Sequence, residues 1–242
     1  MAAANVTPMV QQYMAVKQEH QNELLFFRLG DFYEMFFDDA LTASRELNLT
    51  LTKRSNGMEN MPMCGVPYHS VDGYIAKLIK KGYRIAICEQ VEDPKLAKGI
   101  VERKVIKIIT PGTALNEQLL EDKHNRYLVF LQQDQDKGLC LVAADVTTGE
   151  CEWFLDQTPE SFLNITEQLY RLQPAELVVC FASDDTRDKL QEWLAARLPE
   201  CVVTRYEESA PDADYFAQHF AGNDVPDEVH STVELLLRYL HG

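Results

Sequence analysis

The sequence predicts an α/β fold of two domains, and three observations support this prediction. Short apolar runs alternate with amphipathic segments of helical period along most of the chain. Glycine, proline, asparagine and aspartate separate these segments as turn signals. The 242 residues, 46% hydrophobic and 25% charged, suffice for one large core or two ordinary ones. This composition excludes a disordered or collagen-like chain.

The first half is expected to begin with a helix, because Thr7 supplies an N-cap and Pro8 occupies the first helical position. Two extended segments follow around a glycine break at Gly30-Asp31, and Asp38-Asp39 caps the next helix. In order, we expect a helix at 7–18, strands at 24–29 and 32–37, a helix at 38–47, a strand at 49–52, a turn at 55–57, an irregular loop at 63–68, a helix from 70 that stops at Gly82, and strands at 83–91 and 101–109.

The second half is expected to start with a meander of three strands, because short turn signals join its first three apolar runs. Helices and strands then alternate. In order, we expect strands at 127–132, 139–146 and 150–155, a helix at 160–172, a strand at 176–180, a helix at 186–198, a strand at 201–206 and a helix at 226–240. This is the element order of a ribonuclease-H-like sheet. The predicted domains are therefore a mixed-sheet α/β domain at 1–113, a linker at 114–126 and a ribonuclease-H-like α/β domain at 127–242.

Charge is distributed unevenly between the two halves. Residues 1–126 hold 16 Lys and Arg against 16 Asp and Glu, whereas residues 127–242 hold 7 against 22. Within the neutral half, residues 53–107 carry 11 basic and 6 acidic side chains, a modest excess that attracts a polyanion. The asymmetry suggests that the two domains have different partners.

The cysteines and the N-terminus exclude several classes of protein. Six cysteines lie far apart without a C-x-x-C pair, which signals neither a disulfide framework nor a metal site. No apolar run approaches the ~20 residues of a membrane span, and the N-terminus lacks the features of a signal peptide. We expect a cytoplasmic protein without a membrane partner.

The segment from Gly30 to Phe37, which reads GDFYEMFF, is the first candidate site. In a strand, Phe32 and Glu34 point to the same face, so a ring and a carboxylate would project together. A projecting ring can wedge into a base stack. The alternative is a core strand in which Phe32, Met35 and Phe36 pack, the more usual place for aromatic strand residues.

Five blocks in order resemble the N-terminal part of the bacterial MutS family of DNA mismatch-recognition proteins. They read FFRLGDFYEMFFDDA, LTLTKR, PMCGVPYHSVDGYIAKLI, AICEQVEDP and VERKVIKIITPGT. The resemblance runs from about Thr7 to Thr113, and more loosely over the remainder. It implies a mismatch-recognition domain followed by a connector domain. It also implies that Phe32 enters the minor groove and stacks on the mispaired base, while Glu34 hydrogen-bonds to that base.

The resemblance further implies that Arg54 and Arg103 contact the DNA backbone, which positions the protein without reading sequence. Lys53, Lys77 and Lys104 are the supporting basic residues of this predicted surface. The alternative is that these charges are ordinary solvated surface.

No catalytic residue is expected in this chain, because it contains no G-x-x-x-x-G-K-[ST] phosphate-binding loop. The ATPase of the family, with its ATP and Mg²⁺, is expected beyond residue 242. No cofactor is expected in residues 1–242. A ribonuclease-H-type nuclease, a third hypothesis, would use Asp145, Glu150 and Glu152 as metal ligands. It would also need a carboxylate on the first strand, and residues 127–132 contain none.

The expected function is recognition of mismatched or unpaired bases in duplex DNA by minor-groove insertion and kinking. The acidic second half is expected to dock proteins, namely the other MutS domains and a MutL-type partner. The resemblance implies a homodimer for the full-length, nucleoid-associated protein, and we expect this piece to be mainly monomeric. The alternative is a protein-interaction adaptor in which the aromatic run is core and the acidic half carries the function.

Overall fold

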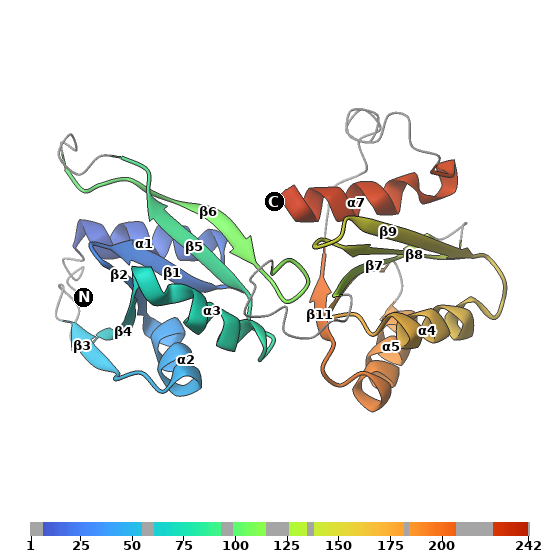
Figure 1. Ribbon diagram of the computed structural model, residues 1–242, viewed down its shortest axis with the longest axis horizontal. Coiled ribbons are helices and arrows are strands. Elements are labelled where there is room, and N and C mark those ends of the chain that lie inside the picture. Colours follow the sequence, from blue (N-terminus) through green and yellow to red (C-terminus); the bar gives the residue numbers. More distant parts are fainter. Residues whose placement is uncertain are drawn as a thin grey trace, which may run out of the picture. The chain divides into compact units, whose positions relative to one another are not determined.

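The computed structural model describes residues 7–54, 61–92, 99–114, 126–134, 138–181, 184–206 and 225–241. The chain divides into two compact units, Met1–Glu121 and Asp122–Gly242 (Figure 1). Most of the predicted linker at 114–126, and the predicted turn at 55–57, lie outside the described residues.

The first unit is a mixed sheet with helices on both faces. Its elements are α1 (Pro8–Glu19), β1 (Leu24–Leu29), β2 (Phe32–Phe36), α2 (Phe37–Leu47), β3 (Thr52–Arg54), β4 (Met61–Pro67), the 3-10 helix η1 (Tyr68–Ser70), α3 (Val71–Ile79), β5 (Ile85–Gln90) and β6 (Arg103–Ile109). Within the described residues, six strands lie in the order β3-β4-β2-β1-β5-β6. Strand β1 is antiparallel to β2 and parallel to β5, so the β1–β2 hairpin occupies the middle of the sheet.

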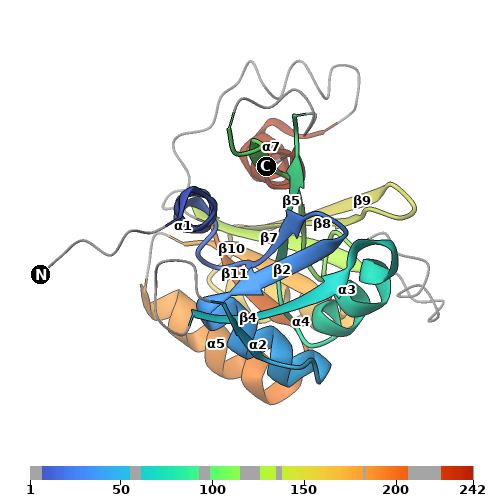
Figure 2. The same ribbon diagram turned by 90° about the vertical axis from the view of Figure 1, so that its left-hand side faces the viewer.

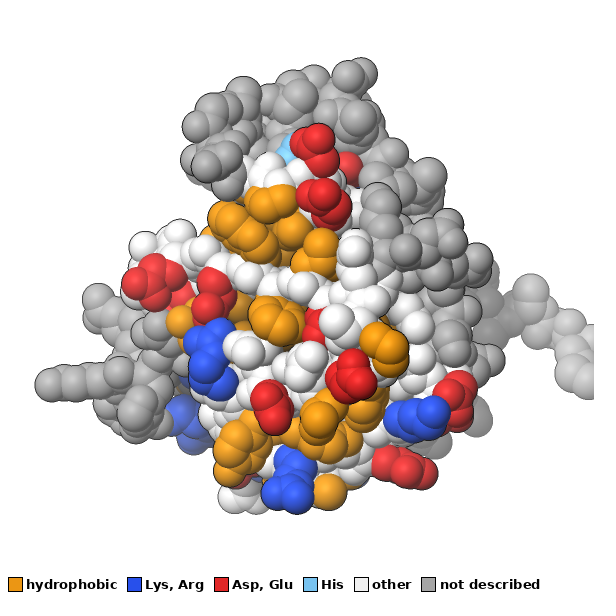
Figure 3. All heavy atoms as spheres, turned by 90° about the vertical axis from the view of Figure 1, so that its right-hand side faces the viewer, with side chains coloured by type: hydrophobic (Ala, Val, Ile, Leu, Met, Phe, Trp, Pro, Cys, Tyr) orange, Lys and Arg blue, Asp and Glu red, His pale blue; other side chains and the backbone are white. Residues whose placement is uncertain are grey.

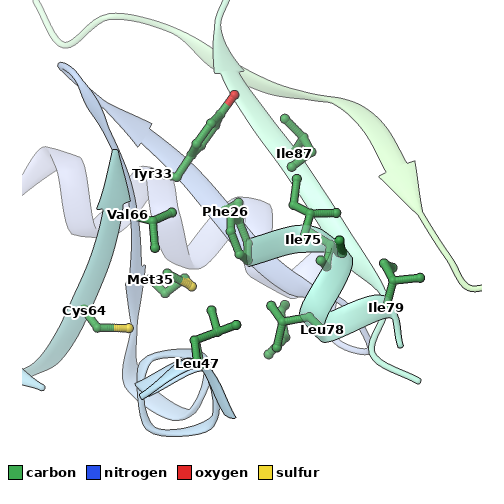
Figure 4. Packing of buried hydrophobic residues seen from close by; sticks show 14 of the residues in the cluster. Phe26, Tyr33, Met35, Leu47, Cys64, Val66, Ile75, Leu78, Ile79 and Ile87 are labelled. Carbon is green, nitrogen blue, oxygen red and sulfur yellow. The ribbon is translucent and has the colours of Figure 1, made fainter. Parts of the chain in front are cut away.

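Each face of this sheet carries its own apolar core. Helices α2 and α3 pack on one face, over side chains that include Phe26 and Met35 (Figure 4). Helix α1 covers the other face, where the Tyr13 ring meets Phe27 and Phe36. Figure 2 shows α1 on the opposite side of the sheet from α2 and α3. Burial on both faces explains why β1 is a continuous apolar run rather than an alternating one.

A buried carboxylate ties α1 to the sheet. Asp39, in the first turn of α2, accepts hydrogen bonds from Lys17 Nζ at 2.9 Å, the Tyr13 hydroxyl at 3.1 Å and the Leu25 amide at 3.0 Å. Burial and the nearby Asp39 charge raise the pKa of Tyr13, so its hydroxyl stays protonated and can donate. One side chain thus joins three elements.

The structure corrects two elements of the first unit. The prediction of an irregular loop at 63–68 is wrong, because most of these residues belong to β4, paired between β2 and β3. Pro67 ends that strand, where the missing N–H is tolerated. The strand predicted at 49–52 begins instead at Thr52. The Leu49 amide bonds to the Ser44 carbonyl at 3.0 Å and closes the end of α2.

The second unit is a separate mixed sheet. Its elements are β7 (Tyr127–Asp134), β8 (Gly138–Asp145), β9 (Glu150–Asp156), α4 (Ser161–Leu172), β10 (Glu176–Cys180), α5 (Asp184–Arg197), β11 (Val202–Arg205), the 3-10 helix η3 (Asp227–Val229) and α7 (His230–His241). The strand order among the described residues is β11-β10-β7-β8-β9. Strands β7, β8 and β9 form an antiparallel meander, and β10 is parallel to both β7 and β11.

The helices of the second unit also lie on both faces of its sheet. Helices α4 and α5 contribute to one apolar core and α7 to the other. The predicted meander and the alternation after it are confirmed, whereas the ribonuclease-H-like assignment stays a prediction. No helix in the described ranges of either unit is long and apolar enough to cross a membrane.

Candidate nucleic-acid interface

Phe32 lies at the exposed end of the β1–β2 hairpin. It is the first residue of β2, opposite Leu29 in β1 and Pro67 in β4, and the residue is 47% exposed. Met35 and Phe36 of the same strand are buried in the two cores. The alternative in which all three side chains pack in the core therefore holds for Met35 and Phe36 but not for Phe32.

Glu34 shares the face of β2 on which Phe32 lies. It is half-buried, opposite Phe27 in β1 and Gly65 in β4. Phe36, two residues further on, is buried against Tyr13. Along this face β2 thus presents an exposed ring, a half-buried carboxylate and a buried ring, as expected from the period of two in a strand.

The turn before Phe32 is held at both of its carbonyl groups. Gly30 and Asp31 form the two-residue connection, and Gly30 has a φ of +57°, a region that favours glycine. Arg28 Nε donates to the Gly30 carbonyl at 2.6 Å. The Tyr68 amide donates to the Asp31 carbonyl at 3.0 Å. The position of Phe32 is therefore fixed by neighbours on both sides of the turn.

Four side chains form a cluster on the opposite face of the hairpin, and we call Arg28, Tyr33, Tyr68 and Glu89 the brace. The Arg28 guanidinium carbon lies 3.7 Å from the centre of the Tyr68 ring, and its Nη1 lies 3.7 Å from Glu89 Oε1. The Tyr33 hydroxyl donates to the same Glu89 oxygen. Figure 4 shows the Tyr33 ring on the side of Phe26 and Met35, with its oxygen directed toward β5.

Burial and the Glu89 hydrogen bond raise the pKa of Tyr33 to about 12. The hydroxyl is therefore protonated at neutral pH and remains a donor. Sequence reasoning missed this cluster. The available signal was Arg28, the only charged residue in the apolar run of β1.

The predicted backbone-contact residues do not lie together. Lys53, Lys77 and Lys104 are exposed, on β3, α3 and β6 respectively. Lys53 pairs with Pro62, five residues along β4 from Pro67, which places it about 17 Å along the strand from the level of Phe32. Lys104 pairs with Glu102 at 3.1 Å. The side chain of Arg54 lies outside the described residues.

Arg103, one of the predicted backbone contacts, lies inside the first unit. Its side chain is buried, and the residue is 7% exposed. Nε donates to the Arg28 carbonyl at 2.6 Å, and Nη1 donates to Gln12 Oε1 at 2.9 Å and to the Val101 carbonyl at 2.8 Å. Burial lowers the pKa of this guanidinium. A phosphate contact needs an accessible donor, so Arg103 instead joins α1, β1 and β6 in this structure.

The carboxylates proposed as nuclease ligands have other partners. Asp145 is buried, and its Oδ1 accepts from the Thr147 hydroxyl at 2.6 Å and the Thr147 amide at 2.8 Å. These bonds lower the pKa of Asp145 against the effect of its burial. Glu152 pairs with Arg171 at 2.9 Å. Across the described ranges, no three His, Cys, Asp or Glu side chains are grouped as metal ligands would be.

Comparisons with known proteins agree with the resemblance in the sequence. Residues 7–118 match the family model for MutS domain I. The DNA mismatch repair protein MutS of Staphylococcus epidermidis is 44% identical over 241 residues, which are 98% of this chain and 26% of that protein. The MutS of Geobacillus thermodenitrificans is 44% identical over 97% of this chain and 25% of that protein.

A third relative, the MutS of Pelotomaculum thermopropionicum, is 51% identical over 73% of this chain and 20% of that protein. A crystal structure of Archaeoglobus fulgidus Pelota aligns with a TM-score of 0.28 and 15% identity over 88% of this chain and 68% of that chain. The chain spans 26% or less of the length of these three MutS relatives. The chain therefore contains a MutS domain I at residues 7–118.

Proposed function

We propose that this chain recognises mismatched or unpaired bases in duplex DNA, as part of a mismatch-repair MutS protein. The observation that carries the proposal is the exposed Phe32 ring, presented with Glu34 on one face of a fixed hairpin in a MutS domain I. A large apolar side chain exposed at a hairpin end gains nothing for the fold, and it suits insertion between bases.

Insertion of the Phe32 ring selects mismatches through the deformability of DNA. Opening a base step and kinking the duplex costs a few kcal/mol of stacking. The cost is smaller where a base is mispaired, since part of the stacking and pairing is already lost. An identical ring therefore binds a mismatch more tightly than a matched site.

Glu34 provides a second means of distinguishing mispaired from paired bases. A carboxylate that approaches DNA is repelled by phosphates and loses water, which penalises the complex unless a donor satisfies it. A mobile mispaired base can move to donate to Glu34, whereas a paired base is held in place. The charge thus acts mainly against matched DNA.

The backbone contacts of this proposal use exposed cations. Lys53, Lys77 and Lys104 are accessible, and Arg54 completes the predicted set. The buried Arg103 contributes by holding β1 rather than by binding a phosphate. Each phosphate contact would make the affinity fall with salt concentration.

The second unit is proposed as a connector that docks proteins. On the face that Figure 3 shows, the blue side chains of the described residues occur singly between red and orange ones, and they form no continuous basic stripe. Residues 127–242 hold 7 basic against 22 acidic residues, which disfavours DNA. By family, the partners are other MutS domains, a second MutS copy and a MutL-type protein, and ATP with Mg²⁺ belongs to an ATPase outside this chain. A DNA-repair role places the protein at the bacterial nucleoid.

The test is Phe32→Ala in the whole protein that carries this chain, measured on matched and mismatched duplexes with identical flanks. We expect about a 10- to 100-fold loss of affinity for the mismatched duplex, since stacking of one base on a ring is worth ~1–3 kcal/mol. Binding to matched DNA should change little. Leu41→Ala is the control, because Leu41 on α2 is also 47% exposed. Equal loss on both duplexes, or no loss, would contradict the proposal and favour the adaptor hypothesis.

A further inference from the structure

We infer that Arg28 is a positioning residue for Phe32, acting through the backbone of the β1–β2 turn without touching DNA. This inference rests on the proposed function. It assigns to the brace the task of holding the hairpin rigid while the Phe32 ring enters the base stack.

Arg28 connects the turn to η1 and to β5. Its Nε donates to the Gly30 carbonyl at 2.6 Å, its guanidinium lies against the Tyr68 ring, and its Nη1 lies 3.7 Å from Glu89 on β5. The Tyr68 amide in turn holds the Asp31 carbonyl at 3.0 Å. Both carbonyls of the turn are thereby fixed by residues that also contact each other.

The Arg28 side chain is mostly shielded from water, although its hydrogen bond to the Gly30 carbonyl lies at the surface. The Arg28 side chain is 16% exposed and that of Glu89 is 27% exposed. Ion pairs and ring contacts of a guanidinium are worth more when partly desolvated than on an open surface. The Tyr33 hydroxyl adds a hydrogen bond to the same carboxylate, and this bond orients Glu89 toward Arg28.

Arg28 and Phe32 lie on opposite faces of the hairpin, so Arg28 cannot contact the bases that Phe32 is proposed to contact. It is the cross-strand partner of Tyr33, and Tyr33 lies on the face of Phe26 and Met35. Phe32 and Glu34 lie on the other face, because successive strand residues alternate. Any effect of Arg28 on the Phe32 ring must therefore pass through the turn.

A rigid turn matters because insertion of the Phe32 ring disrupts base stacking, which costs a few kcal/mol of free energy. A turn that moved freely would lose ordering entropy on binding and would yield instead of opening the base step. The brace orders the turn in the free protein, so this entropy is not lost when DNA binds. Tyr33, Tyr68 and Glu89 are the other residues through which it acts.

The test is a double-mutant cycle between Arg28→Met and Phe32→Ala in the whole protein that carries this chain. We expect Arg28→Met alone to lower affinity for mismatched DNA about tenfold, and to lower it less than about twofold when Phe32 is already alanine. Affinity for matched DNA should change less than about twofold. Arg45→Met is the control, since Arg45 is an exposed arginine on α2 paired with Glu46.

Two further measurements separate positioning from other roles. A phosphate contact by Arg28 would reduce the slope of log K against log salt by about one in the variant, and we expect no change. Hydrogen exchange of the Tyr68 amide without DNA should quicken in Arg28→Met and not in Arg45→Met. If Arg28→Met does not fold, Arg28→Lys, which keeps the charge facing Glu89, takes its place in the cycle.

The outcomes distinguish this inference from the proposed function. If Phe32→Ala lowers mismatch affinity but Arg28→Met does not, or lowers it equally in both backgrounds, the positioning role is overturned and the proposed function stands. An altered salt slope overturns it likewise. If Phe32→Ala itself leaves mismatch affinity unchanged, both fail together.

Discussion

Gly65 lies directly opposite Glu34 across the β2–β4 pair, and a Cβ on Gly65 would lie 3.4 Å from Glu34 Cγ and 3.2 Å from the Tyr33 carbonyl oxygen. The two strands can approach this closely because one of them has no side chain. We expect Gly65→Ala to displace Glu34 or β4 by a few tenths of an ångström. Stability should fall by about 1–2 kcal/mol, and mismatch discrimination should fall with it. The check is urea unfolding together with DNA titration.

The control for this change is Gly99→Ala, because a Cβ on Gly99 meets no atom within 4 Å. Its unfolding and DNA binding should match those of the unaltered protein. Unchanged discrimination in Gly65→Ala would show that the position of Glu34 is not set by β4.

Glu34→Gln keeps the shape of the side chain and removes its charge. We expect affinity for matched DNA to rise about fivefold, since the negative charge no longer repels the DNA phosphates or loses its hydration in that complex. Mismatched DNA should gain less, so the ratio of the two affinities should fall. The measurement is a titration of both duplexes at one salt concentration, and an unaltered ratio would refute the discriminating role of the charge.

Gly30→Ala tests the turn itself. The φ of +57° at Gly30 disfavours alanine by about 1 kcal/mol, although its Cβ would meet no atom within 4 Å. Gly149→Ala is the matched control, with a φ of +78° and equally open space, in the turn between β8 and β9. Both variants should lose similar stability in thermal unfolding. Only Gly30→Ala should lose mismatch affinity, and the same loss in both would contradict the role of the turn.

Asp39→Ala should destabilise the first unit by about 3 kcal/mol. The change leaves the Leu25 amide and Lys17 without their buried acceptor and removes the bond from Tyr13. Asp38→Ala, an exposed neighbour in the same helical turn, should cost about 0.5 kcal/mol or less. Chemical denaturation measures both. Comparable losses would mean that the Asp39 hydrogen bonds contribute little to holding α1 on the sheet.

The hydroxyl of Tyr33 makes stability depend on alkaline pH. Its pKa is raised from 10.0 to about 12 in the fold. Its contribution is complete below pH 10 and is lost as pH rises toward 12, because the unfolded chain releases this proton first. Between about pH 10 and 11, the free energy of unfolding should fall by about 1 kcal/mol more than in Tyr33→Phe. Parallel pH profiles of the two proteins would contradict this.

Local sequence signals predicted much of the fold. Thr7-Pro8 marked the start of α1, and Gly30-Asp31 marked the hairpin turn. The interval from Glu176 to Cys180 was a strand at the predicted bounds. Gly65 and Pro67 misled, because both residues favour loops and only the pairing with β2 explains why they lie in a strand. Pairing between strands that are distant in the sequence produces no local sequence pattern from which it could be predicted.

The candidate site was harder to predict than the fold. The alternation of side chains along a strand predicted that Phe32 and Glu34 share one face. It did not predict that the Phe32 ring lies outside the core. The pair Arg103-Lys104 shows the limit clearly, since one side chain is buried beneath α1 and the next is exposed. Successive residues of β6 point to opposite faces of the sheet, so one member of an adjacent basic pair must point inward. Two neighbouring charged residues do not indicate which one it is.

The parallel pairing of β1 with β5 constrains the order in which the first unit can assemble. The hairpin of β1 and β2 closes over two residues, a step of microseconds, whereas β1 and β5 join residues about 60 positions apart. During synthesis on the ribosome, the hairpin therefore emerges long before Glu89 is available to it. A nascent chain halted ahead of Ile85 would display the aromatic tip without the Glu89 carboxylate, and the Arg28 side chain would gain its anionic partner only when the fifth strand arrives.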